Sequence, residues 1–367
     1  MTKYIKRFEL TSQYEEYINS IIGLLPNVSI IKDINGVHYN SFLNYLKFTA
    51  EKNNSTISLN SKTSPDIKYS LNRSEWTQWD YKDITLNIGD TVYMKGNNSN
   101  GFSTGFSSYN TFNMSGKISA SGNIMSLLYE DDFEGKLTIP CNYCFYQMFI
   151  SCTALTTTPE LPATTLTYKC YESMFDGCTS LTNATTTLPA TILTDSCYSY
   201  MFRGCKSLTT APELPATSLA YGCYFQMFYN CKSLTTTPEL PATTLTENCY
   251  GYMFKGCKSL TTTPELPATT LTPYCYNGMF DSCTSLTVAP TLSATRLEDY
   301  CYQEMFSGCT NLNYIKMLAT NIRADYCLDG WVYGVSSTGT FVKDPNMTSL
   351  PTGYSGIPTG WTVQDVA

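Results

Sequence analysis

The chain has 367 residues and a net charge of −7, and only 14% of its residues are charged. That length exceeds what one hydrophobic core normally serves, and the abundant Thr, Ser, Asn and Tyr suit a β-rich external surface better than a helical cytosolic enzyme. The only basic cluster is Lys3, Lys6 and Arg7, which argues against a nucleic-acid partner, and no window approaches about 18 apolar residues, which argues against membrane insertion.

Residues 1–40 are predicted to form a small N-terminal anchoring module. A capping box precedes a short predicted helix, Gln13–Ile21, and two extended runs flank a hairpin turn at Asn35-Gly36. The first residues lack the apolar stretch of a signal peptide, so we expect a protein that is used without ordinary export. The run P-N-V-S-I-I-K-D-I-N-G-V-H-Y-N resembles a leader of structural and adhesin-type proteins of crAss-like gut phages and their hosts. That resemblance implies contacts between this module and other virion proteins.

Residues 41–120 have the pattern of β-structure throughout. Turn-forming Asn, Ser, Gly and Asp separate short apolar runs at intervals of about 8–12 residues, which predicts a β-sandwich. The predicted strands are Leu46–Ala50, Thr56–Asn60, Ile67–Asn72, Thr77–Trp79, Ile84–Ile88, Thr91–Lys95 and Thr111–Ile118.

A sequence repeat occupies residues 121–327, where a predicted capping coil, Asn123–Pro140, leads into a leucine-rich-repeat solenoid. Cysteines mark the repeat: the first of each pair recurs every 26 or 27 residues, and the second follows eight residues later. A fixed period of this length indicates stacked structural units, about seven here. The pairs begin at Cys144, Cys170, Cys197, Cys223, Cys249, Cys275 and Cys301, with an unpaired Cys327.

The repeat unit reads C-Y-x-x-M-F-x-x-C-x-S-L-T-T-T-P-E-L-P-A-T-T-L-T-x-x. Its first nine residues predict two turns of helix, because Tyr, Met, Phe and the second Cys share one arc when each residue advances by about 100°. The next segment predicts an extended strand, since Leu and Thr favour strands and the prolines prevent helix. Each coil would therefore bury Tyr, Met, Phe and Leu. The predicted fold class is mostly β with short helices.

Residues 328–367 are predicted to form a C-terminal β cap. Trp331 and Val332 stand where Met and Phe belong in the unit, and the runs G-T-F-V-K-D-P and G-I-P-T-G-W-T-V predict two strands. A cap is needed because a bare last coil would expose apolar side chains and unpaired strand groups. We expect Trp361 to cover this end of the core.

The motifs C-Y-x-x-M-F-x-G-C-x-S-L and L-P-A-T-x-L resemble the BspA-like leucine-rich repeats, also called the Treponema pallidum type. The resemblance extends from Asn142 to Ala324 and recurs in seven copies. Proteins of that family are commonly surface adhesins, and similar arrays occur in proteins of gut bacteria and their phages. The resemblance therefore implies a role in binding.

No catalytic, cofactor or metal site is predicted. The single histidine, His38, lies in the N-terminal module, and the chain has no nucleophile-elbow, metalloprotease or phosphate-loop motif. Cysteines eight residues apart do not match the usual spacing of zinc ligands. We interpret them as buried thiols that fill apolar space, with disulfides between coils as the alternative. Cys141, outside the period, is expected to be the most exposed thiol.

A row of glutamates recurs in the P-E-L-P segment, at Glu160, Glu213, Glu239 and Glu265. Neighbouring carboxylates can bind calcium or supply the pair that sugar hydrolysis needs. The recurrence of the same glutamate in several units favours a solvated row of side chains instead, because an active site needs a set of residues found at one place only.

Outward positions of the repeat vary between copies, and many of them are aromatic. Exposed aromatic side chains at a regular pitch suit sugar stacking or protein contact, because they offer a large contact area at low entropy cost. Scattered surface tyrosines in a Tyr-rich chain are the alternative interpretation. The candidate binding surface comprises Tyr168, Tyr200, Tyr221, Phe225, Tyr229, Tyr252, Tyr274 and Tyr300.

These observations predict a non-enzymatic phage-particle protein, a fibre or decoration subunit that attaches to a host-surface glycan or protein through the solenoid. Fibres are often trimers, so a homotrimer is one expected assembly, although no coiled coil enforces it. The alternative is a cell-surface or secreted bacterial adhesin with the same repeats. A glycan-cleaving enzyme is a more distant alternative, and it would need a deep pocket with two carboxylates.

Overall fold

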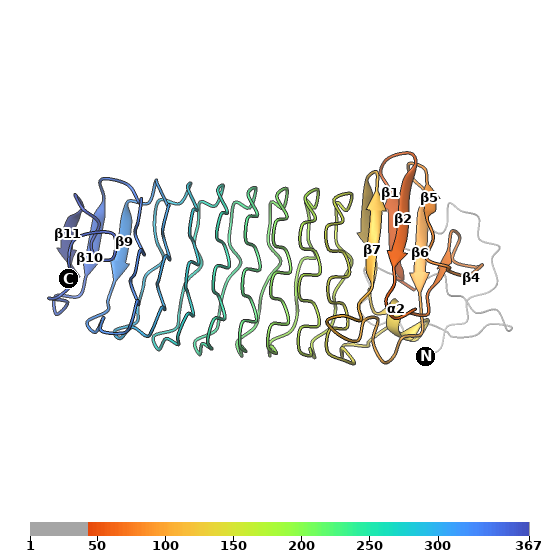
Figure 1. The fold of residues 1–367 in the computed structure, drawn as a ribbon, viewed down its shortest axis with the longest axis horizontal. Coiled ribbons are helices and arrows are strands. Elements are labelled where there is room, and N and C mark those ends of the chain that lie inside the picture. Colours follow the sequence, from red (N-terminus) through yellow and green to blue (C-terminus); the bar gives the residue numbers. More distant parts are fainter. Residues whose placement is uncertain (1–42, 367) are drawn as a thin grey trace, which may run out of the picture. The chain divides into compact units, whose positions relative to one another are not determined.

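The computed structural model describes residues 43–366, which belong to one compact unit with a continuous hydrophobic core (Figure 1). The predicted helix, hairpin and His38 of the N-terminal module lie outside the described residues. Within them the single helix is α2 (Ser126–Tyr129), and all other regular elements are strands. The predicted mostly-β class is therefore confirmed.

Two antiparallel sheets form the part of the described unit that precedes the repeats. Phe48 on the first sheet and Phe112 on the second lie 5.3 Å apart between ring centroids, so the sheets share one core. The first sheet has the strand order β4 (Thr77–Gln78), β3 (Lys68–Ser70), β6 (Thr91–Lys95), β1 (Leu46–Ala50) and β8 (Ile118–Ser121). The second has the order β5 (Ile84–Leu86), β2 (Ser55–Asn60) and β7 (Thr111–Ser115).

Each predicted strand overlaps a strand of the structure, although several bounds differ. The predicted strands Leu46–Ala50 and Thr91–Lys95 have the bounds of β1 and β6. The predicted strand Thr111–Ile118 is too long: β7 ends at Ser115, because the chain turns at Gly116 with φ of 80° and continues as β8 in the other sheet. A side chain at Gly116 would collide with Ser55, so only glycine fits this turn.

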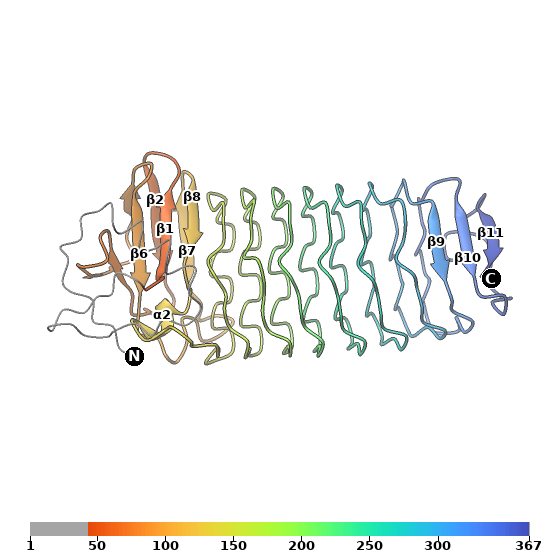
Figure 2. The ribbon, with the colours of Figure 1, turned by 180° about the vertical axis from the view of Figure 1, so that it is seen from behind.

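Each repeat forms one coil, and successive coils lie side by side (Figures 1 and 2). Backbone hydrogen bonds join each coil to the next. The Tyr171 N–H donates to the carbonyl of Cys197 at 3.1 Å, and the Phe175 N–H donates to that of Met201 at 2.9 Å. The same bonds recur one repeat later, which explains the fixed length of the unit.

The predicted two-turn helix at the start of each unit is wrong. The segment is a series of overlapping turns, here called the turn ribbon, in which alternate N–H groups donate three residues back, as from Met174 to Tyr171. Every fourth residue has positive φ, as at Lys169, Ser173 and Gly177. A four-residue period points two neighbouring residues inward and the next two outward. The pattern C-Y-x-x-M-F-x-x-C fits this period, and over nine residues it also fits the 3.6-residue period of a helix.

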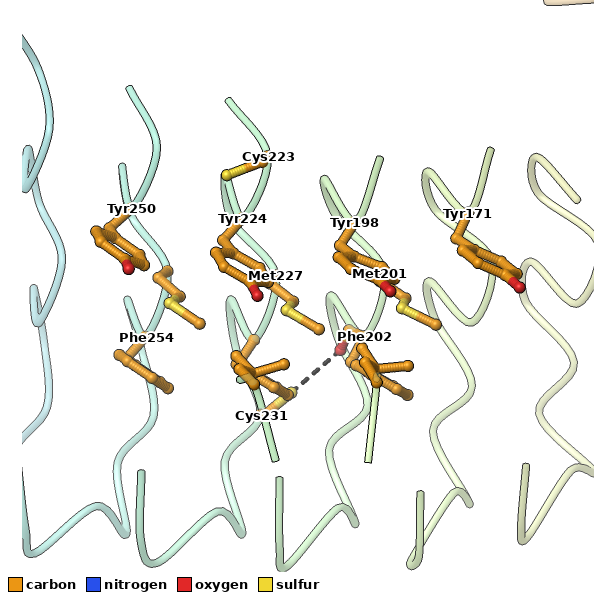
Figure 3. Packing of buried hydrophobic residues seen from close by; sticks show 14 of the residues in the cluster. Tyr171, Tyr198, Met201, Phe202, Cys223, Tyr224, Met227, Cys231, Tyr250 and Phe254 are labelled. Atoms are coloured by element: carbon orange, nitrogen blue, oxygen red, sulfur yellow. Dashed lines mark hydrogen bonds between the residues drawn. The ribbon is translucent and has the colours of Figure 1, made fainter. Parts of the chain in front are cut away.

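Inward side chains form columns that run along the coils, with the rings of successive coils parallel (Figure 3). Ring centroids are 5.8–6.1 Å apart along the column from Tyr171 to Tyr302 and 5.4–5.8 Å apart from Phe149 to Phe306. The predicted interior is therefore confirmed. Its leucine column is fully buried and comprises Leu155, Leu181, Leu208, Leu234, Leu260, Leu286 and Leu312.

Both ends of the column of coils are covered. At the first end, Phe112 of β7 stacks on Phe149 of the first coil at 5.3 Å. At the other end, a parallel sheet with the order β11 (Thr362–Asp365), β10 (Thr340–Lys343) and β9 (Tyr314–Met317) follows the last coils. Trp361 is buried there, as expected.

Candidate functional site

The outward side chains of the turn ribbons form the candidate surface, here called the turn face. The four-residue period of the ribbon determines which residues reach it. Tyr168 and Tyr221 are exposed. The remaining six predicted residues, Tyr200, Phe225, Tyr229, Tyr252, Tyr274 and Tyr300, are half-buried.

Three predicted aromatic residues meet on three consecutive coils. The Phe225 ring packs edge-on against Tyr200, with centroids 5.3 Å apart, and against Tyr252 at 6.0 Å. The Arg203 guanidinium lies 4.7 Å from the Tyr200 ring centroid, and the Lys255 ammonium lies 5.1 Å from that of Tyr252. These five residues are here called the central cluster. Cations over aromatic rings attract the electron-rich ring faces and help to order both groups.

Acidic residues of neighbouring coils hold the two cations of the central cluster. Arg203 pairs with Asp176 at 2.5 Å, and Lys255 pairs with Asp281 at 2.6 Å. The hydrogen bonds that Arg203 donates to Asp176 raise the pKa of Arg203. Burial lowers the pKa of Lys255, but the hydrogen bond and charge of Asp281 outweigh burial, so that pKa is also raised. Both cations stay charged and oriented, so a partner would meet a surface that is already ordered.

The two tyrosines of the central cluster occupy unusual backbone conformations. Tyr200 has φ of 58° and Tyr252 has φ of 54°. The ribbon imposes this left-handed region at the position, where other coils carry Gln226 or Gly278. A bulky residue there costs more than glycine, typically about 1–2 kcal/mol. Large aromatic side chains are thus kept on the turn face at some cost to stability.

A second aromatic group lies on the later coils. Tyr274 and Tyr300 stack with centroids 4.5 Å apart, and Tyr300 stacks on Tyr326 at 5.1 Å. Tyr326 was missed by the sequence prediction although it is 60% exposed. A signal was present, because Tyr326 precedes Cys327 as Tyr274 and Tyr300 precede their own cysteines.

The other predicted residues do not join these two groups. Tyr168 contacts Tyr143 edge-on at 5.4 Å, and Lys169 lies over its ring. Tyr221 and Tyr229 belong to neither group of contacting rings. The structure therefore brings five of the eight predicted residues into two groups.

The recurring glutamates and the cysteines differ in exposure. Glu160, Glu213, Glu239 and Glu265 are all exposed, in agreement with a solvated row. Among residues 43–366, no group of three or more His, Cys, Asp or Glu side chains is placed to hold a metal ion. All 16 cysteines are free thiols, and every one except the half-buried Cys141 is buried.

The coils stack on one another around a buried leucine column, as the repeat motifs predict. No known family profile and no curated protein matches the chain. Among solved structures, the chain is similar to a leucine-rich repeat protein from Bacteroides ovatus, with 17% identity, a TM-score of 0.35, and coverage of 63% of this chain and 64% of that one. It is also similar to a leucine-rich repeat protein of T. pallidum, with 15% identity, a TM-score of 0.24, and coverage of 62% and 78%.

The match spans less than two thirds of the length of the Bacteroides protein. In the described part of this chain, no helix has the length and apolar character needed to cross a membrane.

Proposed function

We propose that this protein is a non-enzymatic attachment protein whose coils form a solenoid that presents the turn face to a glycan or protein on a cell surface. The observation that carries the proposal is the central cluster, in which three rings and two cations are held on three consecutive coils. Tyr and Arg are enriched at binding hot spots because they combine large contact area with directed hydrogen bonds. Ion pairs with neighbouring coils order the cluster before any partner arrives.

The distribution of these groups favours binding over catalysis. Aromatic and charged side chains are spread along several coils, whereas a catalytic site needs convergent groups in one concave place. A glycan chain or a protein surface can contact several coils at once.

Within this proposal the protein is carried on a phage particle, as a fibre or decoration subunit anchored to other virion proteins by residues 1–40. The support is the resemblance of the N-terminal run to leaders of crAss-like phage proteins. Mass spectrometry of purified virions tests this part, and the polypeptide is expected among the virion proteins. Its absence from virions together with its presence on bacterial cells would favour the adhesin alternative.

Attachment is tested by binding of the labelled full chain to cells of gut Bacteroides species. Replacement of Phe225 by Ala removes the ring that joins the two tyrosines, so we expect affinity to fall about tenfold, or about 1.4 kcal/mol. Ile192→Ala is the control, because Ile192 is 67% exposed and lies outside the turn ribbons. Equal binding by both variants and the unchanged chain would contradict the proposed turn-face contact.

A further inference from the structure

A concave feature lies at the C-terminal end, beside the last turn ribbon. It is a depression of about 200 Å³ that is open to solvent, here called the C-terminal pocket. Its lining includes Val332, Val335, Ser337, Tyr354 and Thr359. None of its lining residues carries a charge.

Hydrogen bonds hold the walls of the C-terminal pocket in place. The Val332 N–H donates to the carbonyl of Tyr354 at 3.2 Å, and the Trp331 indole N–H donates to that of Gly356 at 2.9 Å. The Trp361 indole N–H donates to a backbone carbonyl of the opposite wall at 2.7 Å. Both indoles belong to buried residues. The pocket is therefore formed before a ligand binds, which limits the entropy cost of binding.

The chemistry of the lining selects a neutral ligand with both hydroxyl groups and an apolar face. The Ser337 and Thr359 hydroxyls make no hydrogen bond to any described residue, so both can donate and accept. Val332 and Val335 supply apolar wall, and Tyr354 is 63% exposed at the rim. Without a charged lining residue the pocket does not suit phosphate, carboxylate or ammonium groups. Its volume lies below the about 300–1,000 Å³ of drug-sized sites, which limits it to one small ring.

We propose that the C-terminal pocket binds one uncharged pyranose residue of a glycan. The Tyr354 ring packs against the apolar face of the sugar, and the Ser337 and Thr359 hydroxyls hydrogen-bond its hydroxyl groups. This site goes beyond the proposed function of the turn face and does not depend on it.

The test uses the purified full chain and a panel of methyl pyranosides: glucoside, galactoside, mannoside, fucoside and N-acetylglucosaminide. Saturation-transfer NMR is expected to detect binding of at least one glycoside, and titration gives its affinity. Tyr354→Ala should weaken that affinity at least tenfold. Tyr333→Ala is the matched control, because Tyr333 is 65% exposed and contacts the Tyr354 ring edge-on but does not line the pocket. It should change the affinity less than twofold.

Thr359→Val removes one hydroxyl while it keeps the side-chain shape, so it gives a second test that does not remove the aromatic ring. We expect it to weaken glycoside binding about fivefold to tenfold. Absence of binding by every glycoside would overturn the proposal, and so would equal losses in the Tyr354 and Tyr333 variants. Ile192→Ala, outside both candidate sites, should leave glycoside binding unchanged. If the chain binds cells through Phe225 but binds no glycoside, only the pocket proposal is overturned. If the chain binds a glycoside but Phe225→Ala does not weaken its binding to cells, only the proposed function of the turn face is overturned.

Discussion

Second cysteines of the repeat units form hydrogen bonds between coils. The Cys231 thiol donates to the carbonyl of Phe202 at 3.1 Å (Figure 3), and the Cys205 N–H donates to the same oxygen. A carbonyl oxygen has two lone pairs, so the thiol satisfies the second one at a buried position. Cysteine thus combines a small apolar volume with a weak donor, which alanine lacks.

Burial also determines the reactivity of these thiols. It raises the pKa of Cys257 and Cys309 to about 12, so almost no reactive thiolate forms near neutral pH. A hydrogen bond with Cys144 lowers the pKa of the half-buried Cys141. We expect iodoacetamide to label Cys141 in the native protein and to label the other cysteines only in concentrated guanidinium, as read by peptide mass spectrometry. Native labelling of Cys257 as fast as that of Cys141 would contradict this assignment.

The positive φ angles of the turn ribbon predict that replacing a glycine there lowers the stability of the protein. Gly204 has φ of 71°, and a Cβ added there would meet no atom closer than 3.7 Å. Space is therefore available, and the cost of Gly204→Ala is conformational alone. We expect a loss of about 1 kcal/mol in the free energy of unfolding, measured by urea denaturation. The exposed Lys206→Ala is the control with no expected change, and unchanged stability of the Gly204 variant would argue against the left-handed ribbon.

At the scale of elements, the sequence predicted strands, which show alternating apolar and polar residues, better than it predicted turns. Strands β1 and β6 follow from alternating buried and partly buried residues. The turn ribbon was mistaken for a helix because periods of 3.6 and 4 residues nearly coincide over nine residues. A contrary signal was present, since Gly177, Gly204 and Gly256 recur just before the second cysteine. Glycine inside a predicted helix favours left-handed backbone.

The candidate surfaces were predictable to different degrees. The period of the repeat identifies outward positions, so most of the turn face could be named from the sequence. The sequence could not show which of these rings contact one another, because contacts such as that of Tyr200 with Phe225 depend on the coil geometry. The C-terminal pocket was beyond prediction, since residues 332–337 and 353–359 come together through tertiary hydrogen bonds such as those of Val332, Trp331 and Trp361.

One carboxylate adds to the backbone hydrogen bonds that join the first sheet to the first coil. Glu51, just after β1, pairs with Lys117 at 2.9 Å and accepts a hydrogen bond from Thr156 of the first coil at 2.9 Å. The hydrogen bond from Lys117 lowers the pKa of Glu51 below its ordinary value of 4.5. A carboxylate with a lowered pKa in the folded state stabilises the protein above its unfolded pKa, and this contribution is lost as the pH falls through the folded pKa.

We therefore expect Glu51→Gln to lower the free energy of unfolding at neutral pH and to have little effect in acid below the folded pKa. The loss should not exceed about 1 kcal/mol, because the side chain is partly exposed and water screens the ion pair. Urea midpoints of both proteins at neutral and acidic pH measure the difference. Glu247→Gln, at an exposed position on a middle coil, should show no such pH dependence, and a pH-independent loss at Glu51 would contradict the ion-pair explanation.

At the scale of the whole described unit, stability comes from the contacts between adjacent coils. Each coil packs only on the coils beside it, and the phenylalanine column runs without interruption from Phe112 to Trp331. In such an arrangement the free energy of unfolding is close to a sum of coil and interface contributions, and the ends open first unless they are capped. The sheets cover one end, and the parallel strands with Trp361 cover the other.

Removal of the C-terminal cover tests this description. Trp361→Ala leaves a gap beside Gly339 and removes the indole hydrogen bond to Ser336, so the local free energy of opening should fall by about 3 kcal/mol. Hydrogen exchange should then accelerate in β9 and β10, while the coils from Cys197 to Cys257 keep their protection. If hydrogen exchange accelerated equally in those middle coils, the coils would unfold as one cooperative unit. A substitution at the C-terminal end can speed exchange in the middle coils only if all the interfaces between coils open together.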